Sequence, residues 1–297
     1  MYQAHFQLTA NPFSPSSVPG FIYPSVQLEE FLAHFGYALE MEEAFLLLTG
    51  EVGTGKTTAV QALLENQLRN EPVAVLSHTT LTPRELLDEI ARRFGLETRD
   101  HEPKPALIHR LEQFFAGAAR EGRRAVLFLD EAHLLTPAVL EEVRLLSNLR
   151  CEGKPPLLIC LVGQPELAKR LKGPRLRQLR QRISVRYAFE PLTRDETRNY
   201  LAHRLQAAGS PGASEVFAPE AADVIYDGTR GVPREINVLA GQAMLNAYLE
   251  GARQVARAHV VATRSDYGFE GLGGSTGGRD TPDLPLLAMA DAPPRDS

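Results

Sequence analysis

The chain has 297 residues, 43% of them hydrophobic, which is enough to bury the cores of a large domain and a smaller one. Its formal net charge of −5 argues against a protein that coats nucleic acid through bulk positive charge, and its two cysteines, Cys151 and Cys160, are too few for a disulfide framework. The N-terminus lacks the basic start and apolar run of a secretory signal, and no stretch approaches the roughly 20 apolar residues that span a bilayer, so we expect a cytoplasmic protein.

Strands and helices alternate over the first 190 residues. After a proline-rich opening, a helix is expected from near Ser25, and a capping box at 82–85 starts another helix that Gly95 ends. A further helix is expected over about 104–119. Continuously apolar runs predict buried strands at 44–49, 73–76, 125–129 and 157–162. This alternation predicts an α/β fold with a parallel sheet flanked by helices on both faces.

The strand pattern stops at Thr193. A second capping box begins there and opens a helix that should end near Gly209, while Pro219 and Pro233 occupy positions typical of a first helical turn. These signals predict a small C-terminal helical lid. Beyond Asp266, glycine and proline dominate, a composition that predicts a disordered tail. The expected division is 1–190 for the α/β domain, 191–265 for the lid and 266–297 for the tail.

A glycine-rich stretch joins the first expected strand to the next helix. It reads GEVGTGKTT and satisfies the phosphate-loop pattern G-x-x-x-x-G-K-[ST]. Glycines let the backbone N–H groups point at phosphate oxygens, and the following helix adds the positive end of its dipole. Lys56 should reach the β- and γ-phosphates, and Thr57 should ligate Mg²⁺. The predicted nucleotide-binding residues are Gly50, Glu51, Val52, Gly53, Thr54, Gly55, Lys56, Thr57 and Thr58.

Polar residues also follow the third and fourth expected strands. Asp130 and Glu131 lie at the edge where parallel α/β sheets bind ligands. Asp130 should help to hold the metal ion, and Glu131 should polarise the attacking water as general base. Gln164 either contacts the γ-phosphate through its amide or is a simple turn residue. His133 has no partner pattern, which favours a structural or surface role.

Basic residues crowd the segment after Gln164. Three interpretations stay open: a solvated face, an arginine finger supplied across a subunit boundary, or a contact with the phosphate backbone of nucleic acid. Arg182 is the preferred finger, with Arg180 in reserve. Arg234 opens a lid helix, from which it would tie lid position to the γ-phosphate. The basic segment contains Lys169, Arg170, Lys172, Arg175, Arg177, Arg180, Arg182 and Arg186.

The order of these motifs resembles that of the AAA+ ATPases in the general secretion pathway protein A, or ExeA-type, family. The resemblance covers about residues 1–263. It implies ATP and Mg²⁺ as cofactors, nucleotide-dependent oligomerisation, and the roles of sensor one for Gln164, finger for Arg182 and sensor two for Arg234. The matching segments are NPF at 11–13, GEVGTGKTT at 50–58, LFLDEAH at 127–133, LVGQPEL at 161–167, QRI at 181–183 and GVPREIN at 231–237.

The resemblance implies two alternative functions. The first is an ATPase that couples hydrolysis to oligomerisation or remodelling in a bacterial secretion or pilus-assembly system, in the cytoplasm or peripherally at the inner membrane. Family members in secretion often continue into a transmembrane helix and a peptidoglycan-binding module that we do not find in this sequence, which argues against a direct cell-wall role. The alternative is an ATP-dependent DNA-binding regulator of the transposition ATPase type, motivated by the basic segment.

Overall fold

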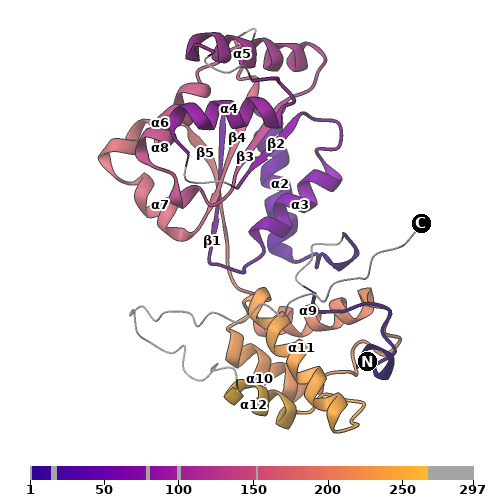
Figure 1. The fold of residues 1–297 in the computed structure, drawn as a ribbon. Helices are drawn as coiled ribbons and strands as arrows, with labels where there is room; N and C mark the ends of the chain where they lie inside the picture. The colour runs from indigo at the N-terminus through magenta and orange to yellow at the C-terminus, as the bar shows by residue number, and fades with distance from the viewer. Residues whose placement is uncertain (1, 15–18, 78–80, 99–101, 152, 267–297) are drawn as a thin grey trace, which may run out of the picture.

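A parallel five-stranded sheet forms the centre of the larger domain (Figure 1). The computed structural model describes residues 2–14, 19–77, 81–98, 102–151 and 153–266. The strands are β1 (Phe45–Gly50), β2 (Val73–Leu76), β3 (Ala125–Leu129), β4 (Leu157–Gly163) and β5 (Ile183–Phe189), in the spatial order β2-β3-β4-β1-β5. β1, β3 and β4 are buried along their whole length, as continuously apolar parallel strands should be.

Helices cover both faces of the sheet, which confirms the predicted fold class. On one face lie α2 (Val26–Glu40) and α3 (Lys56–Asn66). They share a core with the alternate side chains of β1, β3 and β4 that point to this face. The opposite face carries α4 (Pro83–Arg93), α5 (Lys104–Arg120), α6 (Pro137–Leu146), α7 (Pro165–Leu171) and α8 (Arg177–Gln181). Short 3₁₀ turns are η1 (Pro19–Phe21), η2 (Ala132–Leu134) and η3 (Pro174–Leu176). The two helical layers lie to either side of the sheet in Figure 1.

Capping explains where several helices begin. The Ser25 hydroxyl accepts a hydrogen bond from the Leu28 N–H at 3.2 Å and starts α2. Both predicted capping boxes form, at the start of α4 and at the start of α9 (Arg194–Ala207). In each box the threonine hydroxyl accepts from the third helical N–H, and the glutamate carboxylate accepts from the threonine N–H. These contacts satisfy backbone donors that would otherwise lack a partner in the first turn.

The smaller domain is helical. It contains α9 (Arg194–Ala207), α10 (Pro219–Thr229), α11 (Pro233–Leu249) and α12 (Arg257–Asp266), which pack around a core of their own. The N-terminal segment belongs to that core as well, because α1 (Tyr2–His5) is followed by buried Phe6, Leu8 and Phe13. The Thr9 N–H donates to the Ala208 carbonyl at 2.8 Å. Figure 1 shows the N-terminus beside the lid helices, although sequence order groups it with residues 1–190.

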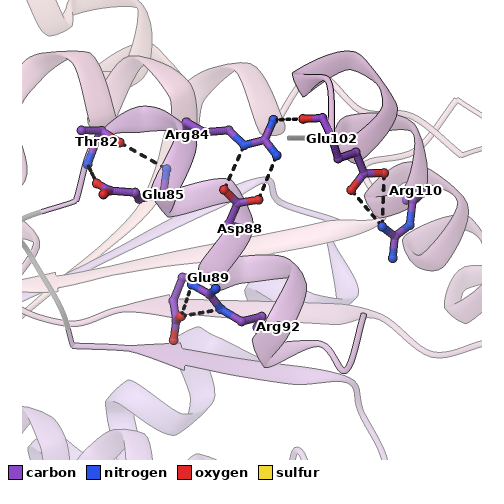
Figure 2. Close-up of polar contacts among 8 residues, drawn as sticks. All are labelled: Thr82, Arg84, Glu85, Asp88, Glu89, Arg92, Glu102 and Arg110. Carbon is purple, nitrogen blue, oxygen red and sulfur yellow. Dashed lines mark hydrogen bonds and ion pairs between the residues drawn. The ribbon is translucent and has the colours of Figure 1, made fainter. Parts of the chain in front are cut away.

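An ion-pair network joins α4 to the start of α5 (Figure 2). Arg84 pairs with Asp88 at 2.9 Å, one turn along α4, and also donates to the carbonyl oxygen of Glu102. The Glu102 carboxylate accepts in turn from Arg110 of α5 at 2.9 Å. Lys104, the first residue of α5, contacts the buried carboxylate of Glu142 at 2.6 Å and so connects α5 to α6. α5 lies at the end of the sheet remote from the lid (Figure 1).

The structure contains elements that the sequence analysis did not predict. These elements are the strand β5 and the α-helices α1, α6, α7, α8 and α12. Arg186 of the basic segment lies within β5. The predicted tail begins at Asp266, the last residue of α12, and its remainder lies outside the described residues. Within the ranges described above, no helix has both the length and the apolar character needed to cross a membrane. The two boundaries between the three predicted segments stay predictions.

Candidate active site

The phosphate loop connects β1 directly to α3, as the sequence predicts. Gly53 and Gly55 adopt left-handed backbone conformations, with φ of +83° and +102°. Glycine adopts these angles without the steric cost that a Cβ atom would bring. Gly55 is the N-cap residue of α3 and supplies no side-chain acceptor, so the first N–H groups of that helix lack a capping side chain. Such N–H groups at a helix start are suited to bind an anion.

Lys56 is the most buried charge of the loop. Its side-chain ammonium donates to the carbonyl oxygens of Gly50 and Glu51, both at 2.8 Å, and the residue is 8% exposed. Burial lowers the pKa of Lys56, while the negative charges of Glu131, Asp130 and Glu51 oppose that shift. The ammonium is therefore folded back onto its own loop and lies within reach of the acids that end β3.

Asp130 and Glu131 follow β3 on a sharp turn. The Asp130 N–H donates to the Leu76 carbonyl at 2.8 Å, which extends the pairing of β3 with β2 by one residue. The Asp130 carboxylate accepts from the Glu131 N–H at 2.9 Å, and Glu131 has a left-handed φ of +51°. This backbone turn directs the two carboxylates differently. The Glu131 side chain is 46% exposed and lines a cavity between the larger domain and the lid, whereas Asp130 does not line that cavity.

The residues at the end of β4 lie beside the acids. Gln164 is the N-cap residue of α7 but makes no capping hydrogen bond with its side chain, and it lines the cavity. Its backbone N–H donates to Nδ1 of His133 at 3.4 Å. The same nitrogen lies 3.3 Å from a carboxylate oxygen of Glu131. His133, for which the sequence favoured a structural or surface role, therefore contacts two candidate catalytic residues.

The lid contacts the phosphate loop through Arg234. The Arg234 N–H donates to the Gly53 carbonyl at 3.3 Å, and a Cβ atom added to Gly53 would lie 2.7 Å from Cβ of Arg234. A tight crossing just before α11 supports this approach, because the Leu192 N–H donates to the Gly231 carbonyl at 2.8 Å. Gly231 has a φ of +81°, and a Cβ there would lie 1.8 Å from the Leu192 carbonyl oxygen. Only glycine fits this crossing.

A cavity of about 640 Å³ lies between the two domains. At one end it is lined by the phosphate loop together with Glu131, Gln164 and Arg234, so the structure brings these predicted residues together. The other end is lined by Phe13 and Asn237, which belong to two of the quoted motifs, and by residues that the sequence analysis did not single out: Phe21, Ile22, Tyr23, Tyr200, Arg204 and Val238. Most of these side chains are aromatic or apolar, as is usual for a pocket that holds a flat organic ring.

Arg204 organises this second end. Its guanidinium donates to the carbonyl oxygens of Pro12 at 2.6 Å and Ser14 at 2.7 Å, and it lies 5.1 Å from the centre of the Phe21 ring. Burial lowers the pKa of Arg204. The residue comes from α9 of the lid, yet it fixes the N-terminal segment that continues into the cavity wall. The one sequence signal near this contact is the Asn-Pro-Phe opening, which gave no hint of its partner.

The connection between the domains is held by Gln27. The amide group of this α2 side chain accepts from the Glu190 N–H at 2.8 Å and donates to the Glu190 carbonyl at 3.3 Å. Glu190 immediately follows β5 and precedes the lid. A glutamine amide paired in both directions imitates the backbone pairing of one more strand residue, so it fixes the chain where it leaves the sheet.

Arg182, the predicted finger, lies outside the cavity. It follows α8, and its guanidinium donates to the Ser147 hydroxyl at 2.8 Å. Arg170 is likewise used internally, because it donates to the backbone carbonyls of His133 and Leu135. In contrast, Lys172, Arg175 and Arg177 are exposed. The predicted basic segment therefore divides into residues that brace the fold and residues that face solvent.

These residues fit a magnesium nucleotide. Left-handed glycines, an uncapped helix start and a buried ammonium form a cradle for phosphates at one end of the cavity. Within the described residues, no group of three or more His, Cys, Asp or Glu side chains is placed to hold a metal ion. Mg²⁺ usually takes one or two protein ligands plus phosphate oxygens and water. Of the two ligands expected from the sequence, Thr57 lines the cavity, whereas the Asp130 carboxylate does not line it and accepts from the Glu131 N–H.

Known proteins are similar to this chain in sequence and in fold. Residues 39–171 match the family model described as an AAA domain. General secretion pathway protein A of Aeromonas hydrophila is 37% identical over 260 residues, which cover 88% of this chain and 47% of that protein. The chain thus spans about half the length of this curated relative.

Solved structures agree on the fold. Cdc6p from Pyrobaculum aerophilum superposes with a TM-score of 0.65 at 19% identity, over 86% of this chain and 70% of that one. A chain from the Drosophila ORC structure bound to DNA gives 0.64 at 19% identity, over 90% and 65%. The RuvB Holliday junction branch migration motor of Thermotoga maritima gives 0.56 at 20% identity, over 86% and 73%. At these identities the likeness concerns the fold alone.

The matched domain, the shared fold and the identity to the Aeromonas hydrophila protein confirm the resemblance predicted from the motifs. Residues 39–171 are an AAA domain within the α/β fold described above, and the chain is similar to the general secretion pathway protein A family.

Proposed function

We propose that this chain binds ATP together with Mg²⁺ and hydrolyses it: water attacks the γ-phosphorus, the bond to the β-phosphate oxygen breaks, and ADP and phosphate leave. The observation that carries the proposal is the position of Lys56, whose buried ammonium lies on the phosphate loop at the end of the cavity lined by Glu131, Gln164 and Arg234. A bound magnesium ion would neutralise phosphate charge, which is the chemistry that it supplies in phosphoryl transfer. The protein side chains do the rest: they bind, orient and accept a proton.

Each residue has a separate role in this proposal. Lys56 leaves the loop carbonyls and donates to β- and γ-phosphate oxygens. Glu131 accepts the proton of the attacking water, since its half-exposed carboxylate lines the cavity and needs no large movement to reach a water molecule there. Gln164 orients that water or the terminal phosphate. Arg234 responds to the γ-phosphate from the lid, and its backbone contact with Gly53 couples this response to the loop.

Arg182 fits a role between subunits. It lies outside the cavity of its own chain, so it meets a nucleotide only when a neighbouring copy presents it. We therefore propose nucleotide-dependent self-association with Arg182 as the finger. Service to a secretion or pilus apparatus, in the cytoplasm or peripherally at the inner membrane, is proposed from the similarity to general secretion pathway protein A.

The test is phosphate release from ATP by the purified chain at several protein concentrations, with and without Mg²⁺. We expect magnesium-dependent turnover whose rate per subunit rises with protein concentration, because the finger must come from a neighbour. Arg182→Ala should abolish that rise. Turnover per subunit that stays constant on dilution would refute the finger, and a lack of any magnesium-dependent ATP binding would refute the whole proposal.

Exposed cations favour a second candidate function. Lys172, Arg175 and Arg177 face solvent close together in the chain, and such clusters bind the phosphate backbone of DNA. A DNA-binding regulator of the transposition type would use this surface. A gel shift with duplex DNA and ATP at two salt concentrations tests it, since phosphate contacts weaken steeply with salt. No shift at low salt would eliminate this candidate.

A further inference from the structure

His133 occupies the space between the ends of β3 and β4. It lies in η2, two residues after Glu131, and its side chain is only 10% exposed. Nδ1 of its ring accepts a hydrogen bond from the Gln164 N–H at 3.4 Å and lies 3.3 Å from a Glu131 carboxylate oxygen. One nitrogen atom therefore faces the proposed general base and the backbone of the proposed sensor at the same time.

The surrounding chain fixes this ring in place. Arg170 of α7 donates to the carbonyl oxygens of His133 and Leu135, which ties η2 to the helix that Gln164 begins. Gly163 leaves room on the other side: a Cβ there would lie 3.2 Å from the His133 N–H nitrogen and 3.4 Å from Nδ1. The imidazole thus approaches the end of β4 closely, and a side chain at Gly163 would require its neighbours to shift by a few tenths of an ångström. A surface histidine would need none of these contacts.

Nδ1 can satisfy its two neighbours only one at a time. When Nε2 carries the proton, Nδ1 uses its single lone pair to accept from the Gln164 N–H and makes no hydrogen bond to the Glu131 carboxylate. When Nδ1 carries the proton, it donates to Glu131, and the Gln164 N–H loses its acceptor. The choice between the two arrangements determines where the half-exposed Glu131 carboxylate is held. His133 is suited to this exchange because each of its two ring nitrogens can either donate or accept.

We propose that His133 is a positioning residue that aligns Glu131 with Gln164 for hydrolysis, an inference that rests on the proposed ATPase activity. His133 does not line the cavity, so it acts through its two neighbours and not on the nucleotide. Loss of the ring leaves the Glu131 carboxylate without its nearest fixed partner. Turnover should then fall while nucleotide affinity stays the same, because the phosphate loop is untouched.

Three variants of the full chain test this role. His133→Ala should lower kcat about 100-fold, the scale expected when a catalytic group is misplaced by about 1 Å. His133→Asn should recover most of that loss, since its amide places either a donor or an acceptor near the position of Nδ1. Leu134→Ala, at an exposed neighbour in the same turn, is the control and should keep wild-type kcat. The affinity of each variant for a non-hydrolysable ATP analogue is measured by calorimetry.

A double mutant separates positioning from a merely structural effect. In the Glu131→Gln background, His133→Ala should cost no further turnover, because the group that it positions is already inactive. An unchanged or raised kcat in His133→Ala, equal losses in the Ala and Asn variants, a parallel loss of affinity, or additive losses in the double mutant would each overturn the role. If the wild-type chain itself binds the analogue but shows no turnover, the proposed hydrolysis fails and this role fails with it. Wild-type turnover with an unaffected His133→Ala variant overturns the role of His133 alone.

Discussion

The two ends of the cavity are built in different ways. At the phosphate end, Lys56 is held by carbonyls only five and six residues before it in the chain, inside one strand-loop-helix unit. At the opposite end, Arg204 holds the carbonyls of Pro12 and Ser14, which lie 192 and 190 residues away in sequence. The first end is a local structure, whereas the second exists only when the lid and the N-terminal segment pack together.

This difference has a mechanical consequence. The phosphate end is attached to buried strands of the sheet, and the lid contacts it through the hydrogen bond from the Arg234 N–H to the Gly53 carbonyl. The aromatic end is attached to the lid through Arg204 and to the sheet domain through α2, which begins at Val26. A change in lid position must therefore alter the aromatic end first. We expect the phosphate end to supply most of the affinity and the aromatic end to link that affinity to lid position.

The largest expected effect is at the phosphate end. Lys56→Ala should weaken ATP binding by about 100-fold or more, because it removes hydrogen bonds to a charged group that contribute about 1.5–3 kcal/mol each. Binding of tripolyphosphate should fall by a similar factor. Glu131→Gln is the matched variant and should bind ATP normally yet hydrolyse it very slowly. Calorimetry and phosphate release measure both, and an equal loss of binding in the two variants would contradict the assigned roles.

A smaller and selective effect is expected at the aromatic end. Arg204→Met removes the donors for the Pro12 and Ser14 carbonyls and should loosen the wall that they support. ATP affinity should fall about 10-fold, equivalent to about 1.4 kcal/mol, while tripolyphosphate affinity should stay unchanged. Competition calorimetry with the two ligands measures this selectivity. A loss of affinity for ATP alone would confirm that the cavity wall supported by Arg204 contacts the part of the nucleotide that tripolyphosphate lacks.

Arg198→Met is the control for that experiment. Arg198 lies on the same helix but pairs on the surface with Asp195 and Asp223, with 41% of its side chain exposed. Exposed pairs of this kind contribute little, so both affinities should match those of the wild type. Should Arg204→Met weaken both ligands equally, the loss would be general unfolding, and the aromatic end would have no separate role.

Gly53 tests the contact between the loop and the lid. Gly53→Ala forces a left-handed alanine, which costs about 1–2 kcal/mol, and adds a Cβ atom 2.7 Å from Cβ of Arg234. Gly55→Ala carries a similar backbone cost at φ +102°, but nothing lies within 4 Å of its Cβ. Without nucleotide, Gly53→Ala should lower Tm more than Gly55→Ala, by the equivalent of about 1 kcal/mol more. Equal changes in Tm would show that the lid does not rest on the loop in solution.

The same division explains what the sequence could predict. β1, β3 and β4 were identifiable because strands buried on both faces are continuously apolar, and capping boxes marked the starts of α4 and α9. β5 was missed because it is an edge strand: Ile183, Val185 and Phe189 are buried, but the residues between them are mostly exposed. Such a short alternation is a weak signal of a strand, and basic residues lie on either side of it and within it.

The site divides in the same manner. Gly50–Thr57 and the acids after β3 form short motifs whose spacing follows from the chemistry, so the sequence alone was enough to predict a phosphate end, and Val52–Thr57 and Glu131 do line one cavity. Arg204 and the residues around Phe21 have no fixed spacing, because their proximity depends on how the lid packs. His133 was set aside for a related reason. Its partner, the Gln164 N–H, is a backbone group that the sequence pattern does not reveal.

The smallest effect is expected far from both ends of the cavity, in the network between α4 and α5 (Figure 2). Arg110→Ala removes the partner of the Glu102 carboxylate, which is only 8% exposed, so the chain should lose about 1 kcal/mol of stability in urea unfolding. ATP affinity and turnover should not change, because α5 lies at the end of the sheet remote from the lid. Arg123→Ala, which breaks an exposed pair with Glu121, should have no measurable effect on either property. A loss of ATP affinity in Arg110→Ala would mean that the phosphate end depends on its outer helices, and the contrast between a self-contained end and a lid-dependent end would then fail.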